Sequence, residues 1–250
     1  MHGGQVKTIE KNGCSFLVKG NETLYHGAPF WDVVQNNRWE PETFKIIEKF
    51  CSKHHAFIDM GAWIGPTTLF GACIANQVYA VEPDPVAIAA LKENMALNKE
   101  LAAKITLFEG CISDSTGSMA IGNQTQFGNS ETSLLYPNAG RRHTVNSLTF
   151  PDFVSRYGIQ HCSLVKMDVE GAEIFILPSM IDFLKQSKPT VFISFHRPMY
   201  GERGDEFLEI AFDILSGLYN NVYAVEGRKI QEISAVKDAF FDLIATELAW

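Results

Sequence analysis

The chain lacks the features of a membrane-spanning or secreted protein. No run approaches the roughly 18 consecutive apolar residues that a membrane-spanning helix requires, and the segment from Met1 to Lys7 has no apolar core of a secretory signal. The five cysteines are scattered, odd in number and without a Cys-x-x-Cys pair, so we expect reduced, mostly buried thiols. These absences predict a cytoplasmic protein without a membrane span.

An excess of positive charge is also absent. The chain has 21 Lys and Arg residues against 29 Asp and Glu residues, a formal net charge of -8. Because a nucleic-acid backbone repels such a chain, we expect no nucleic-acid partner. The 250 residues, 46% of them hydrophobic, suffice for one sizeable core. We expect a single domain over 1–250, with an N-terminal extension (1–52), a cofactor-binding core (53–200) and a part that completes the sheet (201–250).

A regular alternation of strand-like and helix-like segments begins at residue 56. It predicts an α/β fold of the doubly wound, Rossmann-like kind, a mostly parallel sheet with helices on both faces. The expected strands are Ala56–Met60, Gln77–Val81, Lys104–Phe108, Ser163–Met167, Thr190–Phe195 and Asn221–Val225, preceded by Val6–Ile9 and Cys14–Val18 in the extension. The expected helices are Glu42–Phe50, Thr67–Ala75, Pro85–Leu97, Glu173–Leu184 and Glu206–Leu218.

One polar segment, residues 113–149, interrupts this alternation. It is rich in Ser, Thr, Asn and Gly and is typical of a hairpin with loops. A long polar insertion in a compact domain is either functional or mobile. Within it, Arg141-Arg142-His143 is either a solvated loop tip or a contact for an anionic or polyhydroxyl acceptor. The pattern over Ile230–Trp250 fits either a sheet edge or a helix.

The turns after the first two core strands predict a nucleoside-binding pocket. Ligands of open α/β sheets bind beyond the carboxyl ends of the strands. Asp59 ends the first core strand, and Gly61 and Gly65 allow the backbone to turn sharply and to approach a ligand. Glu82 ends the second core strand, where a carboxylate can accept both hydroxyl groups of a ribose.

The spacing of this turn favours S-adenosylmethionine over a dinucleotide. In the pattern G-x-G-x-x-G, Asp59 takes the place of the first glycine and Gly65 falls one position late. An acid would repel a pyrophosphate, whereas it suits the ammonium group of a methionine moiety. The candidate cofactor contacts are Asp59, Gly61, Ala62, Trp63, Gly65, Glu82 and Pro83, together with Asp168 and, beside the adenine, Cys111, Ile112 and Ser113.

The fourth core strand ends in a cluster of charged residues. Alternation along a strand places Lys166, Asp168 and Glu170 on one side. Carboxylates at this density require a cation, which Lys166, the cofactor sulfonium, a divalent metal or an arginine would supply. Glu173 suits the first turn of the next helix, where the helix dipole favours an acid.

The fifth core strand ends at His196. Its expected position is a carboxyl strand end beside the acidic strand. A neutral imidazole is a suitable base for a hydroxyl group near physiological pH. The candidate catalytic residues are therefore His196, Asp168 and Glu170.

Several of these strings together resemble one known family. The FkbM-type methyltransferases are similar over about residues 38–198, in Trp39-Glu40, Phe57–Gly65, Val81-Glu-Pro83, Lys166-Met-Asp-Val-Glu-Gly-Ala-Glu173 and the strand ending in His196. The resemblance implies the class I methyltransferase fold with a seven-stranded sheet, S-adenosylmethionine as cofactor, and methylation of hydroxyl oxygens. It also implies that Asp168 and Glu170 line the reaction centre.

The chain departs from that family at three positions. Trp63 stands where the family usually has Asn, and Pro66 where an aromatic or polar residue is common. Ser194 stands where an acid commonly precedes the histidine by two places.

The expected function is S-adenosylmethionine-dependent O-methylation of a sugar, a glycolipid or a secondary metabolite, with a small-molecule or glycan acceptor. Two alternatives stay open. One is an O-methyltransferase in which Asp168 and Glu170 hold a divalent metal that polarises the acceptor, although no metal ligand is assigned. The other is a protein that binds the cofactor without catalysis.

Overall fold

The computed structural model describes residues 5–20, 24–25, 27–236 and 238–250. The described strands are β1 (Val6–Lys11), β2 (Cys14–Lys19), β3 (Leu24–Tyr25), β4 (Ala28–Pro29), β5 (Ala56–Met60), β6 (Gln77–Glu82), β7 (Ile105–Ser113), β8 (Gly117–Asn123), β9 (Arg141–Thr149), β10 (Cys162–Met167), β11 (Thr190–His196), β12 (Asn221–Ala224) and β13 (Phe240–Thr246). The described α-helices are α1 (Phe30–Gln35), α2 (Pro41–Phe50), α3 (Pro66–Ile74), α4 (Pro85–Leu97), α5 (Lys99–Ala102), α6 (Phe150–Tyr157), α7 (Glu173–Ser187) and α8 (Gly204–Leu218).

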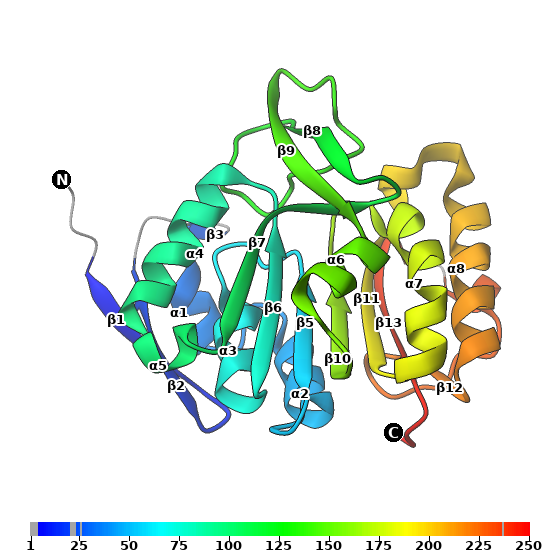
Figure 1. Cartoon of the computed structure of the whole chain (residues 1–250), viewed down its shortest axis with the longest axis horizontal. Helices are drawn as coiled ribbons and strands as arrows, with labels where there is room; N and C mark the ends of the chain where they lie inside the picture. Colours follow the sequence, from blue (N-terminus) through cyan, green and yellow to red (C-terminus); the bar gives the residue numbers. More distant parts are fainter. Residues whose placement is uncertain (1–4, 21–23, 26, 237) are drawn as a thin grey trace.

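Nine of these strands form one mixed sheet, in the order β12-β13-β11-β10-β5-β6-β7-β9-β8 (Figure 1). The strands from β11 to β9 in this order run parallel, and β13 and β8 run antiparallel to their neighbours. The predicted α/β fold with a mostly parallel sheet is therefore confirmed. Because β5, β6, β10 and β11 are parallel, their carboxyl ends lie at one edge of the sheet.

The sheet has two more strands than the seven that the family resemblance implied. Strands β9 and β8 extend it beyond β7 and form a hairpin that rises at the top of Figure 1. Both strands come from the polar segment that predicted a hairpin with loops. Only part of each strand is buried, so the alternation that marks a strand is weak in the sequence. Residues Ile230–Trp250, which the pattern could not place, contain β13.

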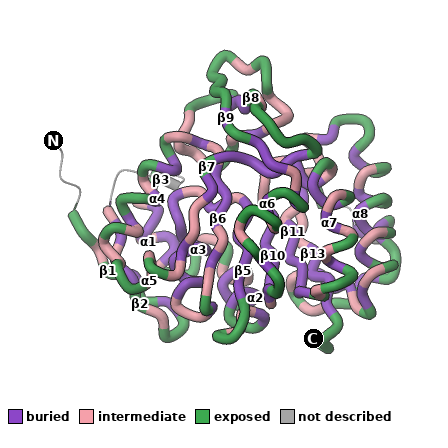
Figure 2. The backbone as a smooth tube through the Cα atoms, viewed as in Figure 1, coloured by how far each residue is buried: buried purple, intermediate pink, exposed green. Residues whose placement is uncertain are grey.

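The sheet separates two hydrophobic cores. Neighbouring residues of β5 point to opposite faces, so Phe57 belongs to one core and Ile58 to the other. Helices α2, α3 and α4 and the hairpin β1–β2 cover the first face, and α6, α7 and α8 cover the second. Figure 2 shows the central strands as the buried layer between them.

Local signals fix the helix that follows β6. Asp84 caps α4, because its Oδ1 accepts hydrogen bonds from the backbone N–H groups of Val86 (2.8 Å) and Ala87 (3.2 Å). Pro85 is the first helical residue, where its fixed φ favours the helix and its missing N–H is not needed. The helix therefore has the predicted bounds, Pro85–Leu97.

The N-terminal segment packs against the same helix. The backbone N–H groups of Leu17 and Lys19 in β2 donate to the side-chain oxygens of Asn98 and Asn94, each at 2.8 Å. Phe30 and Trp31 of α1 are buried in the first core. The extension is thus part of the packed fold.

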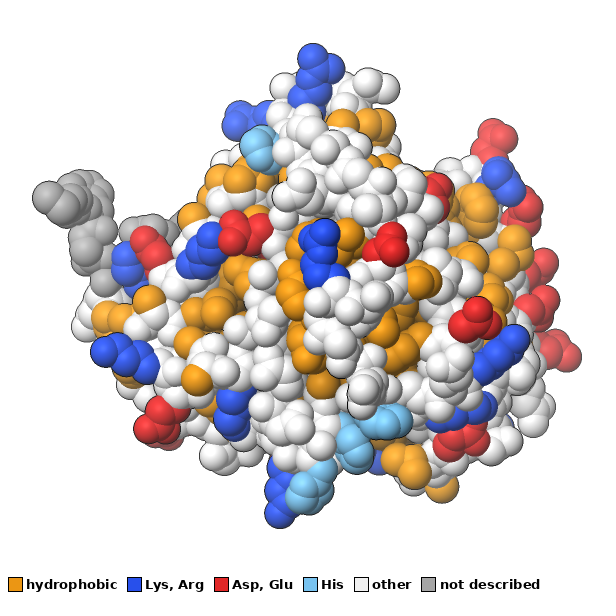
Figure 3. Space-filling model, viewed as in Figure 1, with side chains coloured by type: hydrophobic (Ala, Val, Ile, Leu, Met, Phe, Trp, Pro, Cys, Tyr) orange, Lys and Arg blue, Asp and Glu red, His pale blue; other side chains and the backbone are white. Residues whose placement is uncertain are grey.

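Among the helices that the structure describes, none combines the length and the apolar character needed to cross a membrane. Charges of both signs are distributed over the face shown in Figure 3. Acidic side chains gather along the edge where α8 lies, and basic ones at the top, where the β8–β9 hairpin lies.

Candidate functional site

A cavity lies at the carboxyl ends of the central parallel strands. The predicted site residues that line it are Gly61, Ala62, Trp63, Glu82, Pro83, Cys111, Ile112, Asp168, Glu170 and His196. Three predicted residues, Asp59, Gly65 and Ser113, are not part of the lining. Residues that sequence reasoning did not assign to the site complete it: Trp39, Glu40, Met60, Pro66, Thr67, Val81, Asn129, Ser130, Thr132, Leu134, Lys166, Val169 and Ala172.

The two glycines of the first turn are required by neighbouring protein atoms. Gly61 has φ +85°, and a Cβ on it would lie 1.8 Å from the carbonyl oxygen of Asp168. Gly65 has φ +99°, and a Cβ there would lie 2.6 Å from the side chain of Leu91. The sequence suggested that these glycines allow close approach of a ligand, and Gly61 does line the cavity. The structure shows in addition that they allow close approach of the segment after β10 and of α4.

Asp59 lies beneath the cavity lining. Its side chain is fully buried, and its Oδ2 accepts hydrogen bonds from the hydroxyl groups of Thr67 (2.8 Å) and Thr68 (2.6 Å). Its Oδ1 lies 3.8 Å from the ammonium nitrogen of Lys166. Because Thr67 and Lys166 themselves line the cavity, Asp59 supports two lining residues from below.

Glu82 presents a carboxylate at the end of β6. Its Oε2 accepts from the backbone N–H of Trp63 (2.7 Å) and its Oε1 from that of Asp84 (2.8 Å). Each oxygen keeps a lone pair, which suits the two hydroxyl groups of a ribose. Burial raises the pKa of Glu82 to about 8, although the two backbone bonds act in the opposite direction.

Trp63 connects three segments of the chain around the cavity. Its backbone is left-handed, with φ +48°, a conformation that costs a non-glycine residue energy. Its ring meets Phe30 edge-on (centroids 4.5 Å apart) and lies 6.4 Å from Trp39, and its Nε1 donates to the carbonyl oxygen of Gly128 at 2.9 Å. Trp63, which stands where the family usually has Asn, therefore packs against the N-terminal extension and bonds to the insertion at residues 113–149.

The insertion is fastened over the cavity by Asp84. While Oδ1 of Asp84 caps α4, its Oδ2 accepts from the backbone N–H of Gly128 (2.8 Å) and the hydroxyl of Thr132 (2.6 Å). The hydroxyl of Ser133 also donates to the carbonyl oxygen of Glu170. The polar composition of the segment is the signal that its side chains take part in the site.

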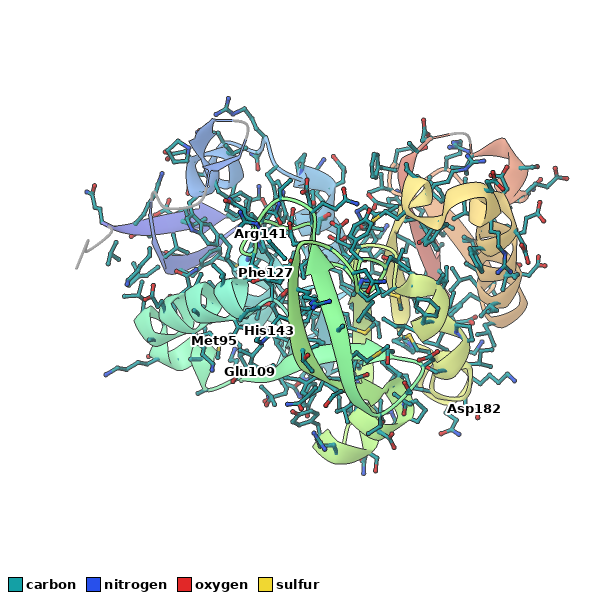
Figure 4. The ribbon with its side chains drawn as sticks, turned by 90° about the horizontal axis from the view of Figure 1, so that it is seen from above. Met95, Glu109, Phe127, Arg141, His143 and Asp182 are labelled. Atoms are coloured by element: carbon teal, nitrogen blue, oxygen red, sulfur yellow. The ribbon has the colours of Figure 1, made fainter. Side chains whose placement is uncertain are left out.

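Arg141, Arg142 and His143 lie outside this site. They begin β9, are exposed, and do not line the cavity, so the interpretation as a loop tip is corrected to a strand. The ring of His143 lies 6.5 Å from that of Phe127. Figure 4 shows Phe127, Arg141 and His143 together around the hairpin.

The predicted catalytic residues meet at one end of the cavity. The Nε2 of His196 lies 3.5 Å from Oε1 of Glu170 and 3.8 Å from Oδ1 of Asp168, and its Nδ1 lies 3.9 Å from Oε1 of Glu173. Burial favours the neutral imidazole, but these carboxylates outweigh it and raise the pKa of His196 to about 9. The hydroxyl of Tyr200 donates to Glu173 at 2.7 Å and fixes this carboxylate.

Lys166 supplies the cation that the cluster requires. Its side chain is 2% exposed, and its Nζ lies 3.4 Å from Oδ2 of Asp168 and 3.8 Å from Oδ1 of Asp59. Burial favours the neutral amine, but Asp168, Asp59 and Glu40 together raise the pKa of Lys166 above its usual value. The ammonium group is thus held in its charged form.

An acid is also present beside Ser194, although the sequence lacks one at that position. Strand β13 places Asp242 opposite Ser194 in the antiparallel pairing of β11 with β13. Burial raises the pKa of Asp242. The neighbouring strand therefore provides the carboxylate near His196.

The same cluster contains a geometry suited to a metal ion. Asp168, Glu170 and His196 each offer one ligand atom, and the three atoms lie within 4.8 Å of one another. Two carboxylates and an imidazole suit several divalent cations.

The residues also fit S-adenosylmethionine. The lining carries the carboxylates of Glu40, Glu82, Asp168 and Glu170 against the ammonium of Lys166 and the imidazole of His196. Burial raises the pKa of Glu40, Glu82 and Glu170 to about 8, so a ligand with a net positive charge would favour the charged forms of these acids. The carboxylate of Glu82 suits the ribose, and the apolar surface of Ile112 suits the adenine.

Comparison with known proteins agrees with this geometry. The model of the methyltransferase FkbM domain matches residues 59–219, more than half of the chain. No curated protein matches the chain. The structure of methyltransferase FkbM from Methylobacillus flagellatus KT is similar, with a TM-score of 0.52 and 17% identity, over 86% of this chain and 53% of that chain. This chain thus spans about half the length of that protein.

TYW2 from M. jannaschii, solved in complex with AdoMet, is a more distant neighbour. It matches with a TM-score of 0.43 and 14% identity over 96% of this chain and 83% of that chain. The family match, with the fold and the pocket already described, gives the identity: the chain belongs to the FkbM methyltransferase family.

Proposed function

We propose that the protein methylates a hydroxyl oxygen of a small-molecule or glycan acceptor, such as a sugar, a glycolipid or a secondary metabolite. The observation that carries this proposal is the position of His196, whose Nε2 lies at the cavity between Asp168 and Glu170. When bound, S-adenosylmethionine supplies a methyl group that is already activated. The protein then has to position the acceptor and remove its proton.

His196 is the proposed acceptor of the hydroxyl proton. With its pKa raised to about 9, the imidazole is protonated at neutral pH when Lys166 is the only other cation beside these carboxylates in the described part of the chain. A cationic ligand beside these carboxylates takes over part of their negative potential and lowers the pKa of His196. We therefore expect the imidazole to be neutral, and able to accept a proton, when the cavity holds the cofactor.

Asp168 and Glu170 are proposed to position the imidazole and the acceptor. Each lies within 3.8 Å of the Nε2 of His196. The second oxygen of Glu170 is left for a hydroxyl group of the acceptor, whereas that of Asp168 accepts from Lys166. The insertion residues Asn129, Ser130 and Thr132 add polar groups to the lining. Such a surface suits a polyhydroxyl acceptor.

The proposal is tested with His196→Ala and Asp168→Asn. Formation of S-adenosylhomocysteine is measured against a panel of sugars and glycolipids, and cofactor affinity is measured separately by calorimetry. We expect turnover to fall by about 100-fold or more, while affinity for S-adenosylhomocysteine changes little in His196→Ala. The exposed His143→Ala is the matched control. Unchanged turnover in both site variants would refute the assignment.

Metal-assisted O-methylation is a second candidate. The specific observation is the set of ligand atoms from Asp168, Glu170 and His196 within 4.8 Å. Such an ion would polarise the acceptor hydroxyl and lower its pKa. Activity that disappears with a chelator and returns with Mg²⁺ or Mn²⁺ would support this function, whereas activity that is insensitive to the chelator would exclude it.

A further inference from the structure

We propose that Glu40, and not Asp59, accepts the α-ammonium group of S-adenosylmethionine. The inference rests on the proposed function, because it needs this cofactor in the cavity, but it is independent of the acceptor.

Asp59 is not accessible to the ammonium group. Its side chain has no exposed surface, and it is absent from the cavity lining. The hydroxyl groups of Thr67 and Thr68 occupy its Oδ2, and Lys166 lies between its Oδ1 and the cavity residue Asp168. A ligand could reach Asp59 only if Thr67 and Lys166 were displaced.

Glu40 reaches the cavity from the segment before α2. It is exposed, lines the cavity, and has a left-handed backbone with φ 38° and ψ 54° directly before Pro41. The residue before a proline normally adopts an extended conformation, so this backbone is strained. Thr43 fixes it, because its N–H donates to the carbonyl oxygen of Glu40 and its hydroxyl donates to Oε2, each at 3.1 Å.

The remaining oxygen of Glu40 is available for a ligand. Within the described part of the chain, Oε1 of Glu40 accepts no hydrogen bond, and no cationic nitrogen lies within 4.0 Å of the carboxylate. The other lining carboxylates have partners: Glu82 accepts two backbone bonds, and Asp168 and Glu170 adjoin His196. The accessible surface of Glu40 lies in the cavity lining. The protein around its carboxyl group, with a further contribution from Asp168, raises its pKa to about 8. A cation beside it would restore the charged form.

The strand order places Glu40 at the end of the cavity where the amino-acid part of the cofactor is expected. The charges that act on Glu40 are those of Asp168 and Lys166, around β10, and Asp242 on β13. Glu82, Cys111 and Ile112 lie at the ends of β6 and β7, on the other side of β5. If the nucleoside occupies the β6–β7 side, the amino-acid end of the cofactor extends toward β10 and Glu40.

Calorimetric titration of the full chain with three ligands tests this proposal. S-adenosylmethionine and S-adenosylhomocysteine both carry the ammonium group, whereas 5′-methylthioadenosine lacks the amino-acid end. We expect Glu40→Gln to lower the affinity for the first two ligands by about 10-fold or more, as for loss of a charge-assisted hydrogen bond. The affinity for the third ligand should stay within about 2-fold of wild type. Glu42→Gln is the matched control, because Glu42 lies two residues further on, in the first turn of α2, and pairs with exposed Lys45.

Each other pattern overturns the proposal. If Glu40→Gln binds all three ligands more weakly, Glu40 shapes the pocket as a whole. If only the affinity for S-adenosylmethionine falls, Glu40 contacts the sulfonium. If no affinity changes, Glu40 contacts neither the ammonium nor the sulfonium. The deaminated analogue of S-adenosylhomocysteine extends the test to the wild-type protein. It should bind wild type as weakly as S-adenosylhomocysteine binds Glu40→Gln, and tight binding contradicts the proposal even if the variant is unstable. Failure of every ligand to bind wild type would instead reject the proposed function itself.

Discussion

Replacement of Gly61 by alanine should disturb both stability and the site. The new Cβ would lie 1.8 Å from the carbonyl oxygen and 2.9 Å from the carbonyl carbon of Asp168. Both atoms belong to the backbone, so β5 and the segment after β10 must move apart by more than about 1 Å to relieve the overlap. The left-handed backbone at φ +85° adds about 1–2 kcal/mol for a residue with a Cβ. With about 1–3 kcal/mol for overpacking, the free energy of unfolding should fall by about 2–5 kcal/mol.

Urea denaturation followed by circular dichroism measures this loss, and calorimetry measures binding of S-adenosylhomocysteine to the folded variant. Because Asp168 moves with its carbonyl group, we expect affinity to fall by about 10-fold or more. Gly217→Ala is the control, since a Cβ there meets nothing within 4 Å on the exterior of α8; it should be neutral or stabilise by up to about 1 kcal/mol. A Gly61→Ala variant within about 0.5 kcal/mol of wild type, with unchanged affinity, would refute the argument that the glycine serves this contact.

Two further predictions concern protonation and the insertion. Glu82 has a pKa of about 8 in the folded chain against 4.5 ordinarily, so its contribution to the free energy of unfolding falls as the pH rises from 4.5 through 8. Glu82→Gln should therefore flatten the decline of the urea midpoint over this range, and a slope equal to that of wild type would contradict the burial argument. Thr132→Val removes the hydrogen bond to Oδ2 of Asp84, and with it the bond that Asn123 donates to the hydroxyl, but leaves the cap of α4 at Oδ1. Proteolytic cleavage within residues 124–140 should rise several-fold while the melting temperature stays within about 2 °C; the exposed Thr144→Val is the control, and equal cleavage rates would show that the bond does not hold the insertion.

Sequence reasoning was most successful where the determinants are local. The bounds of α4 follow from Asp84 and Pro85, which act within one turn of the helix. The central strands were recognisable because both of their faces are buried, as in Ala56–Met60. The strands β8, β9 and β13 were not assigned from the sequence, because pairing partners and not apolar alternation determine where they lie.

The site was predictable by position in sequence but not by which side chain faces the cavity. The alternation of Lys166 and Asp168 correctly placed both near the carboxyl end of β10. Asp59 also ends a strand, yet Thr67 and Thr68 on α3 and the length of Lys166 enclose it. Glu40 reaches the cavity because α2 packs against the sheet, and no local pattern in the sequence encodes that packing.

The contact of Trp63 with Phe30 and Trp39 has a consequence for how this pocket can change during evolution. The family match begins at Asp59, whereas Phe30 and Trp39 precede it. A side chain at position 63 that packs well against the N-terminal extension of one relative therefore leaves a gap or a steric overlap against the extension of another. We expect position 63 to covary with positions 30 and 39 among relatives, and a chimaera that joins residues 59–219 to a foreign N-terminal segment to bind the cofactor only when all three positions are transferred together.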